Sequence, residues 1–281
     1  MNNLTNYHSH TSFCDGKAPM EAFIAEAVRQ GFTSYGVSSH APLPFRTRWT
    51  IDDRKQTGLY LQEFARLKRL YGDRIELYVG LEIDYMDEDQ QPANDYFQSL
   101  PLDYRIGSVH LLHSTQGEIV DIDTKPEVFR EHVRLHLGGD LKRVVLAYFD
   151  KLMRMIGRGG FDFIGHADKI SYNVSCCEPN ILGQQWYKDK ISEYFTFIAE
   201  KGAMIEVNTK TLHRNGFLYP NKEHFGLIRT LGIPVVVNSD AHLPELINSG
   251  RPEALRLLKA SGIGAVWQLE RGVWTEVPIG E

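Results

Sequence analysis

Cysteine is scarce in the 281-residue sequence, and so are long apolar runs. The three cysteines, Cys14, Cys176 and Cys177, make a poor disulfide framework because their number is odd and two are adjacent. No apolar run approaches the roughly 18–20 residues of a membrane span. The start of the sequence has no basic segment followed by an apolar one, as a signal peptide would have. These absences predict a cytoplasmic protein in a reducing compartment, with no membrane partner.

Positive charge is also limited. The 31 lysines and arginines face 36 aspartates and glutamates, which gives a formal net charge of −5. Such a chain is not expected to bind nucleic acid, because the phosphate backbone is bound by basic surfaces. No glycine-rich loop with a following lysine is present, so nothing indicates an NTPase. The composition is that of a globular protein, and the expected partner is a small molecule; the oligomeric state stays open.

The chain contains no linker or low-complexity run, which favours one domain over residues 1–281. Short apolar runs alternate with amphipathic stretches, a pattern typical of βα units around a parallel sheet. The expected strands are 4–8, 34–39, 76–83, 104–110, 161–166, 203–208 and 234–239. The expected helices are 20–30, 59–71, 126–136, 141–158, 185–201, 222–231 and 252–261. Seven strands predict an α/β fold of the TIM-like barrel type, one unit short of eight, with an open doubly wound sheet as the alternative. Residues 263–278 indicate a small β-hairpin.

Histidine, by contrast, is abundant, with 11 residues. Imidazoles and carboxylates stand at or just beyond the carboxyl end of every expected strand, positions that converge on one face of a barrel. Nitrogen and oxygen ligands of this kind suit zinc, iron or manganese better than magnesium. About ten candidate ligands predict two or three divalent ions that share carboxylates. The candidates are His8, His10, Asp15, His40, Glu82, His110, His166, Asp168, Glu206, Asp240 and His242.

Several other side chains fit structural roles better. Trp49 is interpreted as a packing residue, and Cys14 as a filler beside Asp15. The pair Cys176-Cys177 is expected in a loop. A non-catalytic metal-binding protein is an alternative function, but it predicts gaps in the ligand set, and none is present.

The motifs carry a more specific resemblance. They include Tyr7-His8-Ser9-His10-Thr11, Ser38-Ser39-His40-Ala41-Pro42, Gly80-Leu81-Glu82-Ile83-Asp84-Tyr85, Gly165-His166-Ala167-Asp168 and Asn238-Ser239-Asp240-Ala241-His242. In this order they resemble the polymerase-and-histidinol-phosphatase (PHP) superfamily, and within it the histidinol-phosphate phosphatases. The resemblance implies a distorted (β/α)7 barrel with a trinuclear centre at the carboxyl face of the strands. By the same resemblance His8, His10, Glu82 and Asp240 hold one ion; Glu82, His110 and His166 a second; and Asp15, His40 and His242 a third.

The resemblance further implies a metal-dependent phosphomonoesterase that hydrolyses L-histidinol phosphate to L-histidinol and phosphate in histidine biosynthesis. A metal-bridging hydroxide is expected to attack phosphorus directly. The expected catalytic residues are Glu82, Asp240 and Asp168, with Asp168 or a metal-bound water protonating the leaving group. The alternative is a related phosphoesterase acting on a nucleotide or sugar phosphate. A hydrolase of C–N bonds is less favoured, because no expected strand ends in the lysine that such enzymes often carbamylate.

Substrate contacts are predicted from loops at the same face. Arg46 and Arg48 follow His40, while Lys169 and Arg214 follow the fifth and sixth strands, and cationic side chains there would bind phosphate. A carboxylate or an aromatic ring would bind the imidazole of the substrate, and the candidates for this contact are Asp84, Tyr85 and Glu206.

Overall fold

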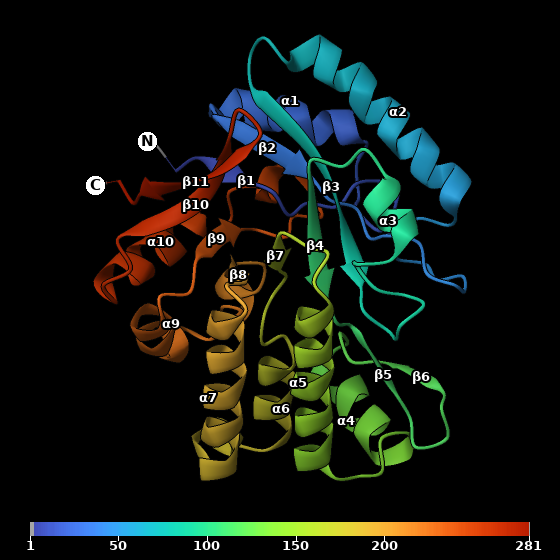
Figure 1. Ribbon diagram of the computed structural model, residues 1–281, viewed down its shortest axis with the longest axis vertical. Helices are drawn as coiled ribbons and strands as arrows, with labels where there is room; N and C mark the ends of the chain where they lie inside the picture. The colour runs from blue at the N-terminus through green and yellow to red at the C-terminus, as the bar shows by residue number, and fades with distance from the viewer. Residues whose placement is uncertain (1–2, 281) are drawn as a thin grey trace.

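The computed structural model describes residues 3–280, and its central element is a parallel sheet that curves into a barrel (Figure 1). Seven strands are paired in the order β1-β2-β3-β4-β7-β8-β9. Their bounds are Thr5–Asn6, Ser34–Val37, Glu76–Asp84, Tyr104–Ser108, Phe163–Ile164, Met204–Asn208 and Val235–Asn238. Each coincides with an expected strand, and the predicted (β/α)7 barrel is confirmed.

Two asparagines close the barrel between its first and last strands. The main-chain N–H of Tyr7 donates to Oδ1 of Asn238, and that of Ser239 donates to Oδ1 of Asn6, both at 2.8 Å. Beyond this point the main chains pair directly, and Ser9 forms a parallel bridge with Ala241. The side-chain amides thus replace main-chain partners where β1 and β9 do not form a ladder.

The major helices surround the sheet (Figure 1). They are α1 Met20–Gln30, α2 Arg54–Tyr71, α4 Pro126–Leu135, α5 Leu141–Arg158, α7 Gln185–Glu200, α9 Phe225–Leu231 and α10 Arg251–Ala260. Helix α5 starts where the Asp140 side chain accepts a hydrogen bond from the N–H of Arg143, and it buries a continuous apolar stripe that includes Tyr148 and Leu152. Helix α1 ends at Gly31, whose φ of 77° allows the left-handed C-cap.

Several shorter elements were not expected from the sequence. They are α3 Asp95–Ser99, β5 Leu111–His113, β6 Ile119–Asp121, α6 Ile170–Cys177, α8 Leu212–Asn215 and the 3₁₀ turns η1 Ile181–Gly183 and η3 Pro244–Leu246. A further 3₁₀ turn, η2 Lys222–His224, forms the start of the expected helix 222–231, which continues as α9. Periodicity does not reveal elements this short. Cys176 and Cys177 therefore end helix α6 rather than lying in a loop.

A hairpin of β10 Ala265–Glu270 and β11 Val273–Pro278 covers the amino-terminal end of the barrel strands. Its turn, Arg271-Gly272, has φ values of 52° and 78°, as a tight hairpin turn requires. The ring of Trp274 packs edge-on against Tyr7 and Phe163, with centroids 5.3 and 5.8 Å apart. The carboxyl ends of the strands lie opposite. Within residues 3–280, no helix is long and apolar enough to cross a membrane.

Candidate metal centre

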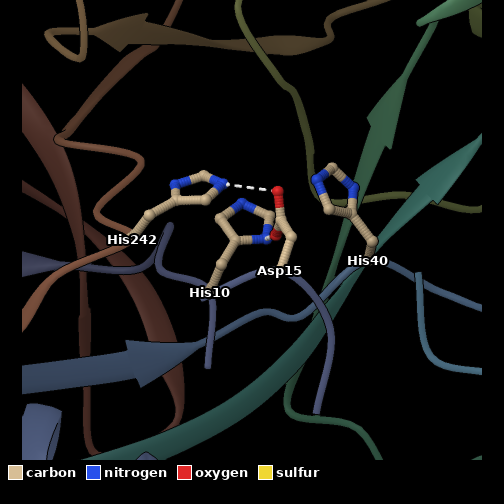
Figure 2. Close-up of side chains that lie close together, drawn as sticks. All are labelled: His10, Asp15, His40 and His242. Carbon is tan, nitrogen blue, oxygen red and sulfur yellow. Dashed lines mark hydrogen bonds and ion pairs between the residues drawn. The ribbon is translucent and has the colours of Figure 1, made fainter. Parts of the chain in front are cut away.

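The predicted ligands converge at the carboxyl ends of the strands. His8 and His10 follow β1 and alternate along an extended segment, so both reach one pocket. Figure 2 shows His10, Asp15, His40 and His242 facing a common space, although His40 and His242 come from segments far from His10 and Asp15 in the chain. Nε2 of His242 lies 3.1 Å from Oδ2 of Asp15.

Glu82, near the end of β3, stands at the middle of this group. Its side chain is only 1% exposed. Five imidazoles surround it: those of His8, His10 and His40 lie 3.1, 3.5 and 3.0 Å from Oε2, and those of His110 and His166 lie 3.5 and 2.8 Å from Oε1. A carboxylate shared in this way can bridge ions held on either side of it.

Three overlapping groups have ligand atoms close enough to hold an ion, all within 4.8 Å of one another in each group. They are His8, His10 and Glu82; His40, Glu82 and His110; and His10, Asp15, His40 and His242. These groups overlap the ligand sets that the resemblance implies, with two differences. His10 also joins the group of Asp15, His40 and His242, and His40 also joins the group of Glu82 and His110. Oδ1 of Asp240 lies 3.1 Å from Nε2 of His10, and Nε2 of His166 lies 3.0 Å from Nε2 of His110.

The atoms that face one another here fit a metal ion. Nε2 of His8, Nε2 of His10, Nδ1 of His40 and Oε2 of Glu82 are buried and have no hydrogen-bond partner within the described chain. Buried polar atoms are nearly always satisfied. Divalent cations among these nitrogen and oxygen atoms would satisfy them together.

The charges of Glu82 and His40 support this interpretation. Burial alone would raise the pKa of Glu82, but the nearby His8, His40 and His110 hold it well below its usual range. Burial lowers the pKa of His40 to about 4. A carboxylate that stays ionised and an imidazole that stays neutral are the forms in which these groups bind metals.

Buried hydrogen bonds to neighbouring side chains orient the candidate ligands. Nδ1 of His110 lies 2.9 Å from Oδ1 of Asp84, and the Ser108 hydroxyl donates to Oε1 of Glu82 at 2.6 Å. Glu206 corrects the sequence-based assignment. Its oxygens bind Nδ1 of His8 at 2.7 Å and the N–H of His166 at 2.8 Å, so it positions ligands rather than facing a substrate.

Two candidate ligands have left-handed backbone conformations, with φ of 28° at His166 and 48° at Asp240. Such conformations are uncommon outside glycine and cluster at functional sites. The conformation turns each side chain at the point where its strand ends.

A cavity of about 160 Å³ opens above the candidate ligands. It is lined by Asp15, His40, Trp49, His110, Asp121, Asp123, Lys210 and His242. Sequence reasoning missed Lys210, Asp121 and Asp123, and it interpreted Trp49 as a packing residue. The ring of Trp49 instead lies 4.8 Å from that of His40, at the cavity wall. In the sequence, the position of Lys210 two residues after β8 could have indicated that it lines the cavity.

The expected phosphate contacts are placed differently from the prediction. Arg46, Arg48 and Arg214 are exposed and do not line this cavity. Lys169 is buried, and its Nζ lies 3.0 Å from Oδ2 of Asp123, below the cavity wall. Nζ of Lys210 lies 3.2 Å from Oδ1 of Asp240 and is the cation that lines the cavity within residues 3–280.

Asp168 also departs from its expected role. It is buried, its Oδ2 accepts a hydrogen bond from the N–H of Asn221 at 3.0 Å, and it does not line the cavity. Burial raises its pKa to about 7. Its carboxylate therefore lies beside the site rather than within it.

Comparisons with known proteins agree with this geometry. A protein of Schizosaccharomyces pombe named "Probable histidinol-phosphatase" is 26% identical, and the match covers 94% of this chain and 89% of that protein. The histidinol-phosphatase of Bacillus subtilis is 25% identical over 84% of this chain and 92% of its own. A crystal structure of histidinol phosphate phosphatase from Lactococcus lactis, complexed with zinc, L-histidinol and phosphate, has a TM-score of 0.72 at 16% identity and covers 97% of this chain and 99% of that one.

The family model of the PHP domain matches residues 6–210, which include the barrel strands β2, β3, β4, β7 and β8 in whole and Asn6 of β1. The same segment contains the candidate ligands from His8 to His166. With its barrel and its histidine-rich carboxyl face, the chain belongs to the PHP domain family.

Proposed function

We propose that this protein is a metal-dependent phosphomonoesterase that hydrolyses L-histidinol phosphate to L-histidinol and phosphate. The observation that carries the proposal is the ring of five imidazoles around the buried Glu82 carboxylate, in which several atoms have no hydrogen-bond partner among residues 3–280. The relatives named histidinol-phosphatase and the Lactococcus lactis complex support the choice of substrate.

Two or three divalent ions, of zinc, iron or manganese, are the proposed cofactors. Their proposed ligands are His8, His10, Asp15, His40, Glu82, His110, His166, Asp240 and His242. Bound there, such ions supply Lewis acidity, which activates water and offsets the charge of the phosphoryl oxygens. The protein holds the ligands in place through Glu206 and Asp84.

Lys210 is the proposed phosphate contact. Its side chain is partly exposed in the cavity, and its ammonium lies beside Asp240 and Nε2 of His242. A lysine at this place binds phosphate as a point charge and orients it toward the candidate ligands. Lys169 supports the site indirectly through Asp123.

The lining of the cavity also suits a cationic amino alcohol that carries an imidazole. Asp123 supplies a carboxylate, and Trp49 supplies an aromatic wall. A protonated amine fits the carboxylate, and the imidazole fits the indole.

Asp121 replaces Asp168 as the proposed donor of a proton to the leaving alkoxide. It lines the cavity, and burial together with the neighbouring Asp123 raises its pKa. A carboxyl group with a raised pKa keeps its proton for transfer. Asp168 meets the pKa requirement but does not reach the cavity.

The test is phosphate release from a panel of substrates with zinc, manganese or iron added in turn. The panel contains histidinol phosphate, a nucleoside monophosphate, a sugar phosphate and an aryl phosphate. We expect kcat/KM to favour histidinol phosphate by several orders of magnitude. The variant His40→Ala should lose bound metal and activity, whereas His136→Ala, at the end of α4, should keep both. Equal low rates across the panel would contradict the substrate, and a fully active His40→Ala would contradict the site.

A further inference from the structure

A second cavity lies between α5 and the β5–β6 hairpin, outside the metal centre. Its volume is about 320 Å³. Three cations of α5, Arg143, Lys151 and Arg154, line one part of it. The apolar side chains Met86, Leu112, Leu137 and Val144 line another. Figure 1 places both elements at the end of the molecule remote from α1 and α2.

The three cations share one face of α5. Their positions differ by eight and three residues, which brings them to the same side of an α-helix. Within residues 3–280, none of them forms an ion pair with a carboxylate. On other helices, Arg29, Arg66, Arg134 and Arg256 each pair with a glutamate three residues earlier. The cavity face of α5 thus lacks the acids that neutralise arginines elsewhere on the surface.

Lys151 is the buried member of this group, with 3% of its surface exposed. Its Nζ donates one hydrogen bond, to the carbonyl oxygen of Leu111 at 2.9 Å. An ammonium group has three protons, so two have no acceptor within residues 3–280. Asp84 and Asp87 act on it only from a distance. A buried charge without a counter-ion costs stability, and an anion in the cavity would remove that cost.

We propose that this cavity binds the phosphate group of a small organic phosphate. The three cations match the double negative charge of a phosphate monoester, and two of them are guanidinium groups, which bind its oxygens in pairs. The cavity is larger than phosphate alone requires, and its apolar wall can accept the organic part. Inorganic phosphate would offer the same charge without that contact. The site is independent of the proposed hydrolysis.

The experiment follows the backbone amide resonances of His113, Ser114 and Thr115 in the zinc-loaded full chain. These residues line the cavity. The probes are phenylphosphonate, which has an apolar ring and resists hydrolysis, and inorganic phosphate. We expect saturable shifts with both probes and tighter binding of phenylphosphonate. Tighter binding of inorganic phosphate than of phenylphosphonate would show an anion site, but one for free phosphate, and would contradict an organic phosphate as its ligand.

Matched variants distinguish binding at this cavity from the general effect of removing a positive charge from the protein. Lys151→Met and Arg154→Gln should each weaken binding about tenfold or more, the size expected for a lost charged hydrogen bond. Arg69→Gln, on α2, removes the same charge from an exposed position and should change nothing. Lys210→Met should leave these amide shifts intact, because it alters only the metal cavity.

Two results would overturn the proposal. One is the absence of shifts at these amides at concentrations that saturate the metal cavity. The other is unchanged affinity in Lys151→Met and Arg154→Gln. If Lys151→Met does not fold, the exposed Arg143→Gln and Arg154→Gln variants decide the question.

Discussion

Nδ1 of His8 donates a hydrogen bond to Oε1 of Glu206 at 2.7 Å, across 198 positions of the chain. The same contact leaves Nε2 of His8 facing Glu82 at 3.1 Å. Because a carboxylate can only accept, Glu206 fixes the ring tautomer and aims the other nitrogen at the candidate metal site.

Glu206→Gln should weaken this orientation. An amide can present a donor to the N–H of His166, which now donates to Oε2 of Glu206. We expect metal affinity to fall about 10- to 100-fold, the usual loss for such supporting residues. Competition with a chromogenic chelator measures it. Glu200→Gln, at the exposed end of α7, is the control, and equal affinity in both variants would contradict the role of Glu206.

Lys210→Met tests the phosphate contact. Because this ammonium lines the cavity and would act on the phosphoryl group, we expect kcat/KM to fall about 10²- to 10³-fold. Metal content should stay nearly unchanged. Steady-state kinetics beside metal analysis distinguish the two effects, with the exposed Lys188→Met as control. Wild-type kinetics in Lys210→Met would remove it from the proposed mechanism.

Asn6→Ala tests the barrel closure. The change removes the acceptor of the Ser239 N–H and the donor to the His8 carbonyl oxygen, both buried. Leaving them unsatisfied should lower the free energy of unfolding by about 2 kcal/mol. Urea denaturation measures the loss, and Asn215→Ala, exposed at the end of α8, should show almost none. A stable Asn6→Ala would mean that the seam holds without its side-chain amides.

Lys151 predicts a pH dependence of stability. Burial lowers its pKa from 10.5 to about 8 in the folded chain. Between these values the unfolded chain binds more protons, so stability should rise as the pH increases from 8 to 10.5. The full effect of this group is about 3 kcal/mol. Urea unfolding across this range should show the rise in the wild type and in Lys188→Met. A rise of the same size in Lys151→Met would contradict the assignment.

Several features follow directly from local sequence patterns. The predicted helices 20–30 and 141–158 match α1 and α5 residue for residue, because their apolar periodicity is long and their ends are marked by Asp140, Gly31 and Gly159. The candidate ligands other than Asp15 could be found because each stands at or just beyond the end of an apolar strand. In a parallel barrel the carboxyl ends of all strands meet on one face. A residue at such an end in the sequence is therefore expected to lie at the site.

The partners of those ligands depend on the tertiary structure. Glu206 belongs to an expected strand end, yet only the folded barrel shows that its side chain meets His8 instead of the cavity. Lys210, Asp121 and Asp123 reach the cavity through a strand end and an unexpected hairpin. Arg46, Arg48 and Arg214 have suitable chemistry and stand in suitable loops, but their side chains are exposed to solvent.

The local sequence pattern therefore determined the barrel and the candidate ligands, because both depend on periodicity within a few residues of one strand or helix. The tertiary structure decided which carboxylate orients which imidazole and which cation enters the cavity. It also decided that α5 presents to a second cavity three cations that form no ion pair within residues 3–280. These outcomes depend on distances of a few ångströms between segments up to two hundred positions apart, and only packing determines such distances.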